Sequence, residues 1–125
     1  FQNPFVKLMH NKQINYSLAF FENWLGHFDG HFLFISGDEI ERNKVPEMGQ
    51  LYLIEAPILL AGVIALAKRR RKFTGFIFAW ILIAPLAAAL TFQTPHALRS
   101  LNMIIPISIV LAVGVDTLIR LFKKV

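Results

Sequence analysis

Three apolar runs and one basic cluster predict an all-α membrane protein, with three transmembrane helices preceded by an extracytoplasmic segment that carries an amphipathic interfacial helix. Of the 125 residues, 55% are hydrophobic, and the mean hydropathy is +0.52. Both values favour a membrane protein over a soluble domain of this size. The apolar runs cover residues 51–67, 73–92 and 101–122. The chain therefore divides into an extracytoplasmic segment over residues 1–50 and a transmembrane bundle over residues 51–125.

The second apolar run sets the expected orientation of the chain. Residues 73–92 contain no charge, and a helix of that length spans a hydrocarbon core about 30 Å thick. Residues 68–72 are all Lys or Arg, and loops rich in these residues stay on the cytoplasmic side. We therefore expect a multi-pass plasma-membrane protein with residues 68–72 and the C-terminus in the cytoplasm, and residues 1–50 and 93–100 on the opposite side. Contact of the basic cluster with anionic lipid headgroups follows, whereas nucleic-acid binding is not expected, because no aromatic residues alternate with the cations.

Composition excludes several other classes of site. The formal net charge of the chain is +5, yet residues 1–50 carry four cations and six anions, so the excess of positive charge lies in residues 51–125. The chain has no cysteine, which excludes disulfides and thiolate metal sites. His27 and His31 have the spacing of metal ligands on a helix, but Asp29-Gly30 interrupts the helix and no third ligand is evident, so no metal is expected. Because the chain begins with phenylalanine and no signal-peptide pattern follows, we expect further helices of the same protein upstream.

Residues 14–28 predict the amphipathic helix of the first segment. Aromatic and aliphatic side chains recur there at three- and four-residue spacings, whereas Asn23 and His27 lie off this stripe. The stripe consists of Tyr16, Phe20, Phe21, Trp24, Leu25 and Phe28. A face so rich in rings suits the membrane interface, and the alternative is a helix packed on a neighbouring soluble subdomain. The Asp29-Gly30 pair is expected to end the helix.

Two segments connect this helix to the first span. Residues 31–36 are a short apolar segment, either extended or a single turn. Residues 37–50 are polar, include two glycines and one proline, and predict a loop. Within this loop, Asp38 and Arg42 predict a structural ion pair, with a substrate-side, sugar-binding surface as the alternative.

Each predicted span contains a residue that needs a structural explanation. Glu55 lies at the start of the first span and must face the outer headgroups or the protein interior, because a charge at the bilayer centre costs about 2.5–3.5 kcal/mol. Pro85 removes a backbone hydrogen bond in the second span and predicts a kink, which is tolerated when neighbours satisfy the freed group. Asp116 and Arg120, four residues apart near the end of the third span, predict an ion pair.

The loop at residues 93–100 joins two spans and is the strongest candidate binding site. A guanidinium at Arg99 can hold a phosphate through two hydrogen bonds. His96 can donate to the same group or transfer a proton. Alternatively, Arg99 anchors a helix end by pairing with Glu55 or with headgroups, and the residues alone leave both interpretations open. The chain has neither a phosphate-binding glycine loop nor a recognisable nucleophile signature.

Several stretches, taken in order, resemble one family. They are HNK at 10–12, FFENWLGHFDGHFLFISGD at 20–38, GQLYLIEAPILLAGV at 49–63 and TPHALRSLNMIIPISIVLAVGV at 94–115. In order and spacing they resemble the C-terminal half of bacterial membrane glycosyltransferases related to the dolichyl-phosphate-mannose protein mannosyltransferases, which have the GT-C fold. The most specific parts are residues 23–38 and 95–106. Gly37, Asp38 and Arg42 match a family loop in which histidine often follows the arginine, whereas this chain has Asn43.

The resemblance implies an enzyme that transfers a sugar from a polyprenyl-phosphate donor to an acceptor on the outer face of the membrane. It implies that His96 and Arg99 line the donor side, with Arg99 near the lipid phosphate. The family's catalytic acid lies in an N-terminal outer loop, so no catalytic residue is assigned in this chain and no cofactor is expected. The expected partners are the donor, membrane lipids and the upstream helices. The alternative function is a non-catalytic membrane module, such as a scaffold, a transporter part or a polymer-export subunit.

Overall fold

The computed structural model describes residues 11–38, 40–43, 45–69, 72–91 and 93–123, and these contain helices and turns but no strand. This confirms the all-helical class. In chain order the elements are α2 (Lys12–Gly26), the π-helical turn η1 (His31–Ile35), the 3-10 turn η2 (Glu41–Asn43), α3 (Glu55–Arg69), α4 (Lys72–Ile83), α5 (Leu86–Ala89), the 3-10 turn η3 (Leu101–Met103) and α6 (Ile104–Phe122). Within the described residues, Lys72–Ala89 and Leu101–Phe122 are long and apolar enough to cross a membrane.

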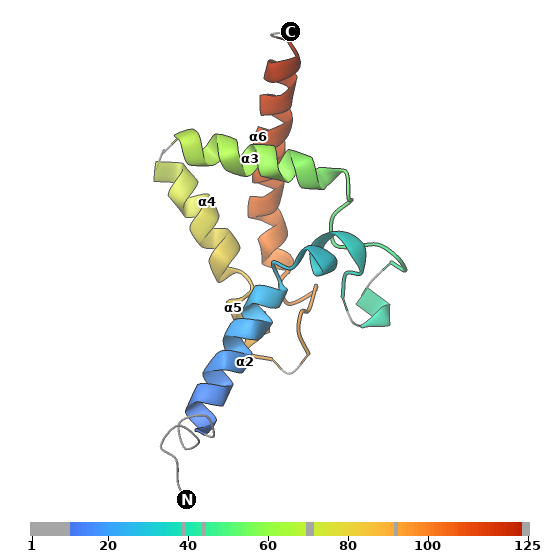
Figure 1. The fold of residues 1–125 in the computed structure, drawn as a ribbon, viewed down its shortest axis with the longest axis vertical. Coiled ribbons are helices and arrows are strands. Elements are labelled where there is room, and N and C mark those ends of the chain that lie inside the picture. Colours follow the sequence, from blue (N-terminus) through green and yellow to red (C-terminus); the bar gives the residue numbers. More distant parts are fainter. Residues whose placement is uncertain (1–10, 39, 44, 70–71, 92, 124–125) are drawn as a thin grey trace, which may run out of the picture.

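The first expected span, residues 51–67, differs most from the sequence prediction. Here α3 begins at Glu55 and has 15 residues, a length of about 22 Å, which is short of a 30 Å hydrocarbon core. Figure 1 shows α3 lying across α6 at a steep angle instead of alongside it. The late start has a local cause, because Glu55 Oε2 accepts a hydrogen bond of 2.8 Å from the Tyr52 N–H. Two candidate spans are therefore shown, and the third is not.

The crossing of α3 and α6 is the most extensive contact between helices. Gly62 of α3 faces the backbone of Val110, and Gly114 of α6 faces the backbone of Ile58. A Cβ atom on either glycine would overlap the carbonyl oxygen opposite it. Only glycine lets the two backbones approach so closely, as at small-residue interfaces between membrane helices. The buried core beside the crossing consists of Leu66, Ile77 and Val110.

Pro85 separates α4 from α5, which confirms the predicted interruption of the second apolar run. Neighbouring side chains satisfy carbonyl groups on both sides of it. The indole Nε1–H of Trp24 donates to the carbonyl oxygen of Leu82 at 2.9 Å. The side-chain amide of Asn23 donates to the carbonyl oxygen of Ala89 at 3.3 Å. Helix α2 thus docks at the break between α4 and α5, as Figure 1 shows.

Helix α2 begins and ends two residues before the predicted range of 14–28. Its aromatic stripe is largely exposed, with Phe21 at 55% and Leu25 at 58%. By contrast, Asn23 and His27, which lie off that stripe, face the rest of the protein. The specific contacts of this helix are therefore made by Asn23, by His27 and by Trp24 of the stripe, whereas Phe21 and Leu25 stay exposed.

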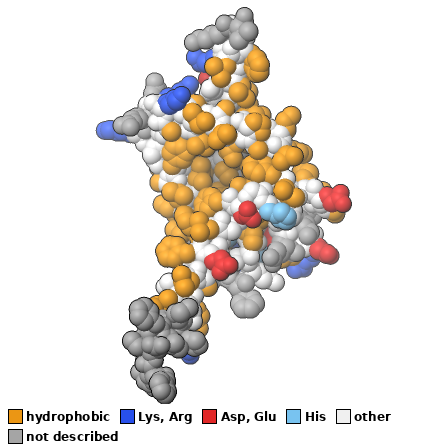
Figure 2. Space-filling view, in the orientation of Figure 1, with side chains coloured by type: hydrophobic (Ala, Val, Ile, Leu, Met, Phe, Trp, Pro, Cys, Tyr) orange, Lys and Arg blue, Asp and Glu red, His pale blue; other side chains and the backbone are white. Residues whose placement is uncertain are grey.

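Charged side chains lie mainly at the periphery of the molecule. In Figure 2, apolar side chains cover the middle of the visible face, and blue Lys and Arg side chains lie near the ends of α3 and α6, with a few more in the lower part of the view. Most red Asp and Glu side chains lie in the lower half of this view. The predicted pair between Asp116 and Arg120 is confirmed, with 2.9 Å between Arg120 Nε and Asp116 Oδ1. Arg69 of α3 approaches the same carboxylate at 3.7 Å.

Candidate functional site

Three ionisable side chains from distant parts of the chain meet at the loop of residues 93–100. His27 follows α2, Asp38 follows η1, and His96 belongs to the loop itself. Their exposed fractions are 0%, 1% and 7%. Because burial of ionisable groups is costly unless they are hydrogen-bonded, the contacts of each side chain define what the cluster can do.

His27 is held in one neutral tautomer. Its Nδ1 lies 2.9 Å from the carbonyl oxygen of Asn23, and its Nε2 accepts a hydrogen bond of 3.2 Å from the backbone N–H of His96. Since a carbonyl oxygen only accepts and a backbone N–H only donates, the proton is on Nδ1. Burial lowers the pKa of His27 below 6.5, and nearby His96 lowers it further, although the Asn23 carbonyl acts in the opposite direction. A neutral His27 thereby ties the loop to α2.

Asp38 ties the same loop to the segment after η1. Its Oδ2 accepts hydrogen bonds from the Ala97 N–H at 2.9 Å and from the Asn43 side chain at 3.3 Å, and its Oδ1 accepts from the Ile40 N–H at 3.0 Å. Burial alone would raise the pKa of Asp38, but these three hydrogen bonds and nearby His96 hold it below 3.8. Asp38 is therefore an ionised anchor at neutral pH.

His96 retains one nitrogen with unused hydrogen-bonding capacity. Its Nδ1 lies 3.7 Å from Asp38 Oδ2, too far for a hydrogen bond, and is buried without a hydrogen-bond partner among the described residues. The backbone carbonyl oxygen of His96 accepts two hydrogen bonds from Ser100, one from its N–H at 3.1 Å and one from its hydroxyl at 2.9 Å. Buried polar atoms without partners are uncommon, so Nδ1 is the one nitrogen of the two histidine rings in this cluster that is known to be left with unused hydrogen-bonding capacity by the described residues.

Arg99 lies in the same loop but is exposed. The ion pairs formed within the described part of the chain do not include it. The alternative pairing with Glu55 is not formed, since that carboxylate caps the start of α3. The two predicted donor-side residues therefore sit on one short turn in different environments: His96 is buried, and Arg99 is open to a ligand.

The predicted ion pair between Asp38 and Arg42 does not form. Asp38 is occupied by Ile40, Asn43 and Ala97, and Arg42 is exposed. Asn43 donates one of the hydrogen bonds that hold the carboxylate.

Sequence reasoning missed the roles of Asn43 and His27. The available signal for His27 was its position four residues after Asn23, which places these two polar side chains on one face of the predicted helix. His31 is engaged elsewhere, because its Nδ1 lies 2.7 Å from the hydroxyl of Ser36. Across the described ranges, no group of three His, Cys, Asp or Glu side chains is placed to hold a metal ion.

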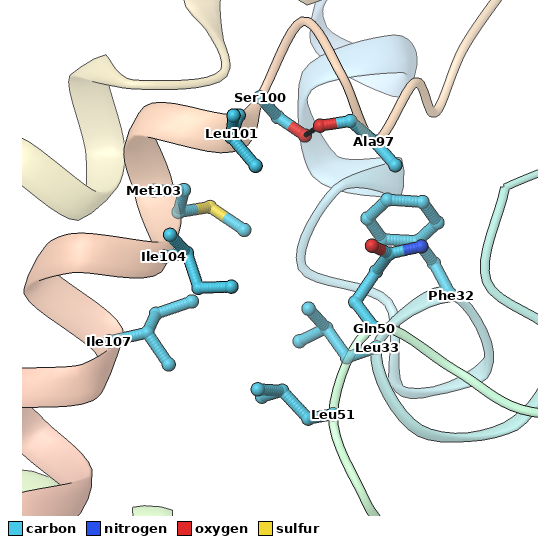
Figure 3. Close-up of a pocket in the computed structure, with 10 residues that line it drawn as sticks. All are labelled: Phe32, Leu33, Gln50, Leu51, Ala97, Ser100, Leu101, Met103, Ile104 and Ile107. Atoms are coloured by element: carbon cyan, nitrogen blue, oxygen red, sulfur yellow. Dashed lines mark hydrogen bonds between the residues drawn. The ribbon is translucent and has the colours of Figure 1, made fainter. Parts of the chain in front are cut away.

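A small pocket of about 40 Å³ adjoins this cluster (Figure 3). It is mostly apolar and lies between η1, residues 50–51 and the start of α6. In Figure 3, Ala97 and Ser100 lie at one end of the pocket, joined by a 3.3 Å hydrogen bond from Ser100 Oγ to the Ala97 carbonyl oxygen. Phe32 lines the pocket and packs edge-on against the His27 ring, with 5.8 Å between ring centroids. The loop thus lines one end of an apolar pocket through Ala97 and Ser100.

No family model, curated protein or solved structure matches this chain.

Proposed function

We propose that this chain is the C-terminal part of an integral membrane glycosyltransferase, which transfers a sugar from a polyprenyl-phosphate donor to an acceptor at the outer face of the membrane. One observation carries the proposal: the two stretches of most specific resemblance, residues 23–38 and 95–106, meet in one buried cluster. His27 accepts a hydrogen bond from the His96 N–H, and Asp38 accepts one from the Ala97 N–H. These contacts fix the loop that presents Arg99.

Arg99 is the residue proposed to bind the donor phosphate. The loop around it is held in place by Asp38 and His27, while its own side chain is exposed. When the sugar leaves, negative charge grows on the polyprenyl phosphate. A cation held in position stabilises that charge more strongly in the transition state than in the ground state.

His96 is the proposed second contact of the donor phosphate. Its Nδ1 has no hydrogen-bond partner among the described residues, and a protonated Nδ1 would donate to a phosphate oxygen. The carboxylate of Asp38 lies 3.7 Å from the same nitrogen. Asp38 keeps a positioning role, because its oxygens already accept three hydrogen bonds. A carboxylate outside this chain would deprotonate the acceptor hydroxyl.

The test is Arg99→Ala in the complete protein, assayed in membranes with a polyprenyl-phosphate sugar donor. We expect sugar transfer to fall about 100-fold or more, as when one charge-stabilising group is removed from an active site, with unchanged membrane insertion. Lys12→Ala removes an exposed cation from α2 and is the matched control, expected to act like wild type. Full turnover by Arg99→Ala would refute the phosphate-binding role.

A non-catalytic membrane module is the second candidate function. The burial of His27 and Asp38 and their hydrogen bonds within the chain favour it, because both residues then serve the fold alone. This candidate predicts that Arg99→Ala changes neither donor binding nor turnover, because neither exists. Binding of a polyprenyl-phosphate sugar by the wild-type protein would decide against it.

A further inference from the structure

A groove with basic walls lies at the opposite end of α6 from the loop of residues 93–100. Its volume is about 290 Å³, and it lies between the last turns of α3 and α6. The lining residues are Ala65, Lys68, Arg69, Thr117, Arg120 and Leu121. The groove therefore combines three cations with an apolar floor.

Asp116 positions the two arginines of this groove. Arg120 donates to both Asp116 oxygens from Nε, at 2.9 and 3.0 Å, and Arg69 Nη2 lies 3.7 Å from Oδ2. These contacts leave the Nη groups of Arg120 without an acceptor among the described residues. Two guanidinium groups are thus held near each other and keep N–H donors that are not used within the described residues. Guanidinium groups bind phosphate through paired hydrogen bonds.

We propose that this groove binds the phosphate headgroup of an anionic phospholipid, with an acyl chain lying along Ala65 and Leu121. Three cations outnumber the single carboxylate of Asp116, so the walls of the groove carry a net positive charge. This charge complements the phosphodiester of an anionic phospholipid, whose headgroup carries no positive group of its own. The apolar floor and the position between the ends of two apolar helices select a lipid over free phosphate. The proposal does not depend on glycosyl transfer, because the groove and the His96 loop lie at different ends of α6.

The experiment measures lipid binding by the purified chain in detergent micelles, using native mass spectrometry. Phosphatidylglycerol, phosphatidylcholine and inorganic phosphate are titrated separately. We expect phosphatidylglycerol to bind at least about tenfold more tightly than phosphatidylcholine, and Arg69→Gln/Arg120→Gln to remove that preference. Lys12→Gln, which removes an exposed cation outside the groove, should keep it.

Ala65→Trp tests the groove without changing any charge. If the acyl chain lies on the floor, the indole ring will displace it and phosphatidylglycerol binding will weaken, while circular dichroism reports an intact helical content. Equal binding of both lipids by wild type, unchanged preference in the double arginine variant, or unchanged binding in Ala65→Trp would each overturn the proposal. Competition by inorganic phosphate at the same concentration as the lipid would overturn it in favour of a free-anion site.

Discussion

The indole Nε1–H of Trp24 donates a 2.9 Å hydrogen bond to the carbonyl oxygen of Leu82, 58 residues further along the chain. Leu82 precedes the break at Pro85, where the regular pattern of helical hydrogen bonds is interrupted. A carbonyl left without a donor costs free energy, most of all in an apolar environment. This single contact therefore stabilises the broken helix and also fixes α2 against it.

Trp24→Phe should lower the free energy of unfolding by about 1 kcal/mol, because it removes the donor and keeps most of the ring. Thermal unfolding in detergent, followed by circular dichroism, measures the change. Trp80→Phe is the matched control, since the Trp80 indole makes no hydrogen bond within the described residues. If both variants unfold like wild type, the contact does not contribute to stability.

Gly62→Ala should destabilise the chain by about 1–3 kcal/mol, because its new Cβ would overlap the carbonyl oxygen of Val110 and force α3 away from α6. Gly114→Ala meets the carbonyl oxygen of Ile58 and should behave alike. Gly75→Ala is the control, because a Cβ there meets nothing within 4 Å and alanine favours a helix. Chemical denaturation of the three variants gives the comparison. Similar stability for all three would contradict a close crossing.

Asp38→Ala should release the loop of residues 93–100. The substitution leaves the Ala97 N–H without its acceptor, and hydrogen bonds to a charged group contribute about 1.5–3 kcal/mol. Hydrogen exchange read by mass spectrometry should become faster in this loop. Arg42→Ala, at an exposed position outside the network, should change stability by less than about 0.5 kcal/mol. If Asp38→Ala and Arg42→Ala changed stability equally, the result would support the Asp38–Arg42 ion pair predicted from the sequence.

Stability should fall as the pH is lowered through 6.5. The pKa of His27 is below 6.5 in the folded protein because the ring is buried, so below that pH the unfolded chain binds the extra proton first and unfolding is favoured. Asp38 also makes stability fall as the pH is lowered, but only below 3.8, the pKa of its carboxyl in the unfolded chain.

The measurement for His27 compares unfolding midpoints at about pH 7.5 and about pH 5.5, a range above the Asp38 window. His27→Gln should be less stable than wild type at the higher pH, because the imidazole contacts are lost, and should show a smaller difference between the two midpoints. An undiminished difference in His27→Gln would assign the pH dependence to another group.

The sequence predicted the helical class, the break at Pro85 and the pairing of Asp116 with Arg120, because each depends on neighbours within one helix. It did not predict that α3 lies across α6. That arrangement depends on the contacts of Gly62 with Val110 and of Gly114 with Ile58, which form only in the folded protein. Both glycines stand in apolar runs that are equally compatible with helices crossing the membrane side by side. Local periodicity carries no information about the angle between two helices.

The candidate site was predicted in part. The loop with His96 and Arg99 stood out because it is a short polar segment between apolar runs. The contacts that hold it could not be predicted, since they join His27 to His96 across 69 residues and Asp38 to Ala97 across 59. Arg42 was chosen as the partner of Asp38 because an opposite charge lay nearby in sequence, yet backbone N–H groups and Asn43 satisfy the carboxylate instead.

The backbone of residues 49–51 runs back beside η1, where the Leu51 N–H donates to the Leu33 carbonyl oxygen at 2.7 Å. A side chain at Gly49 would overlap the backbone of Phe34. Within the segment between these contacts, Asp38 is buried, whereas residues 45–47 form an exposed tip. An epitope can be inserted at this tip without displacing α3. Antibodies and impermeant reagents that bind this tip would report which compartment the tip occupies in living cells.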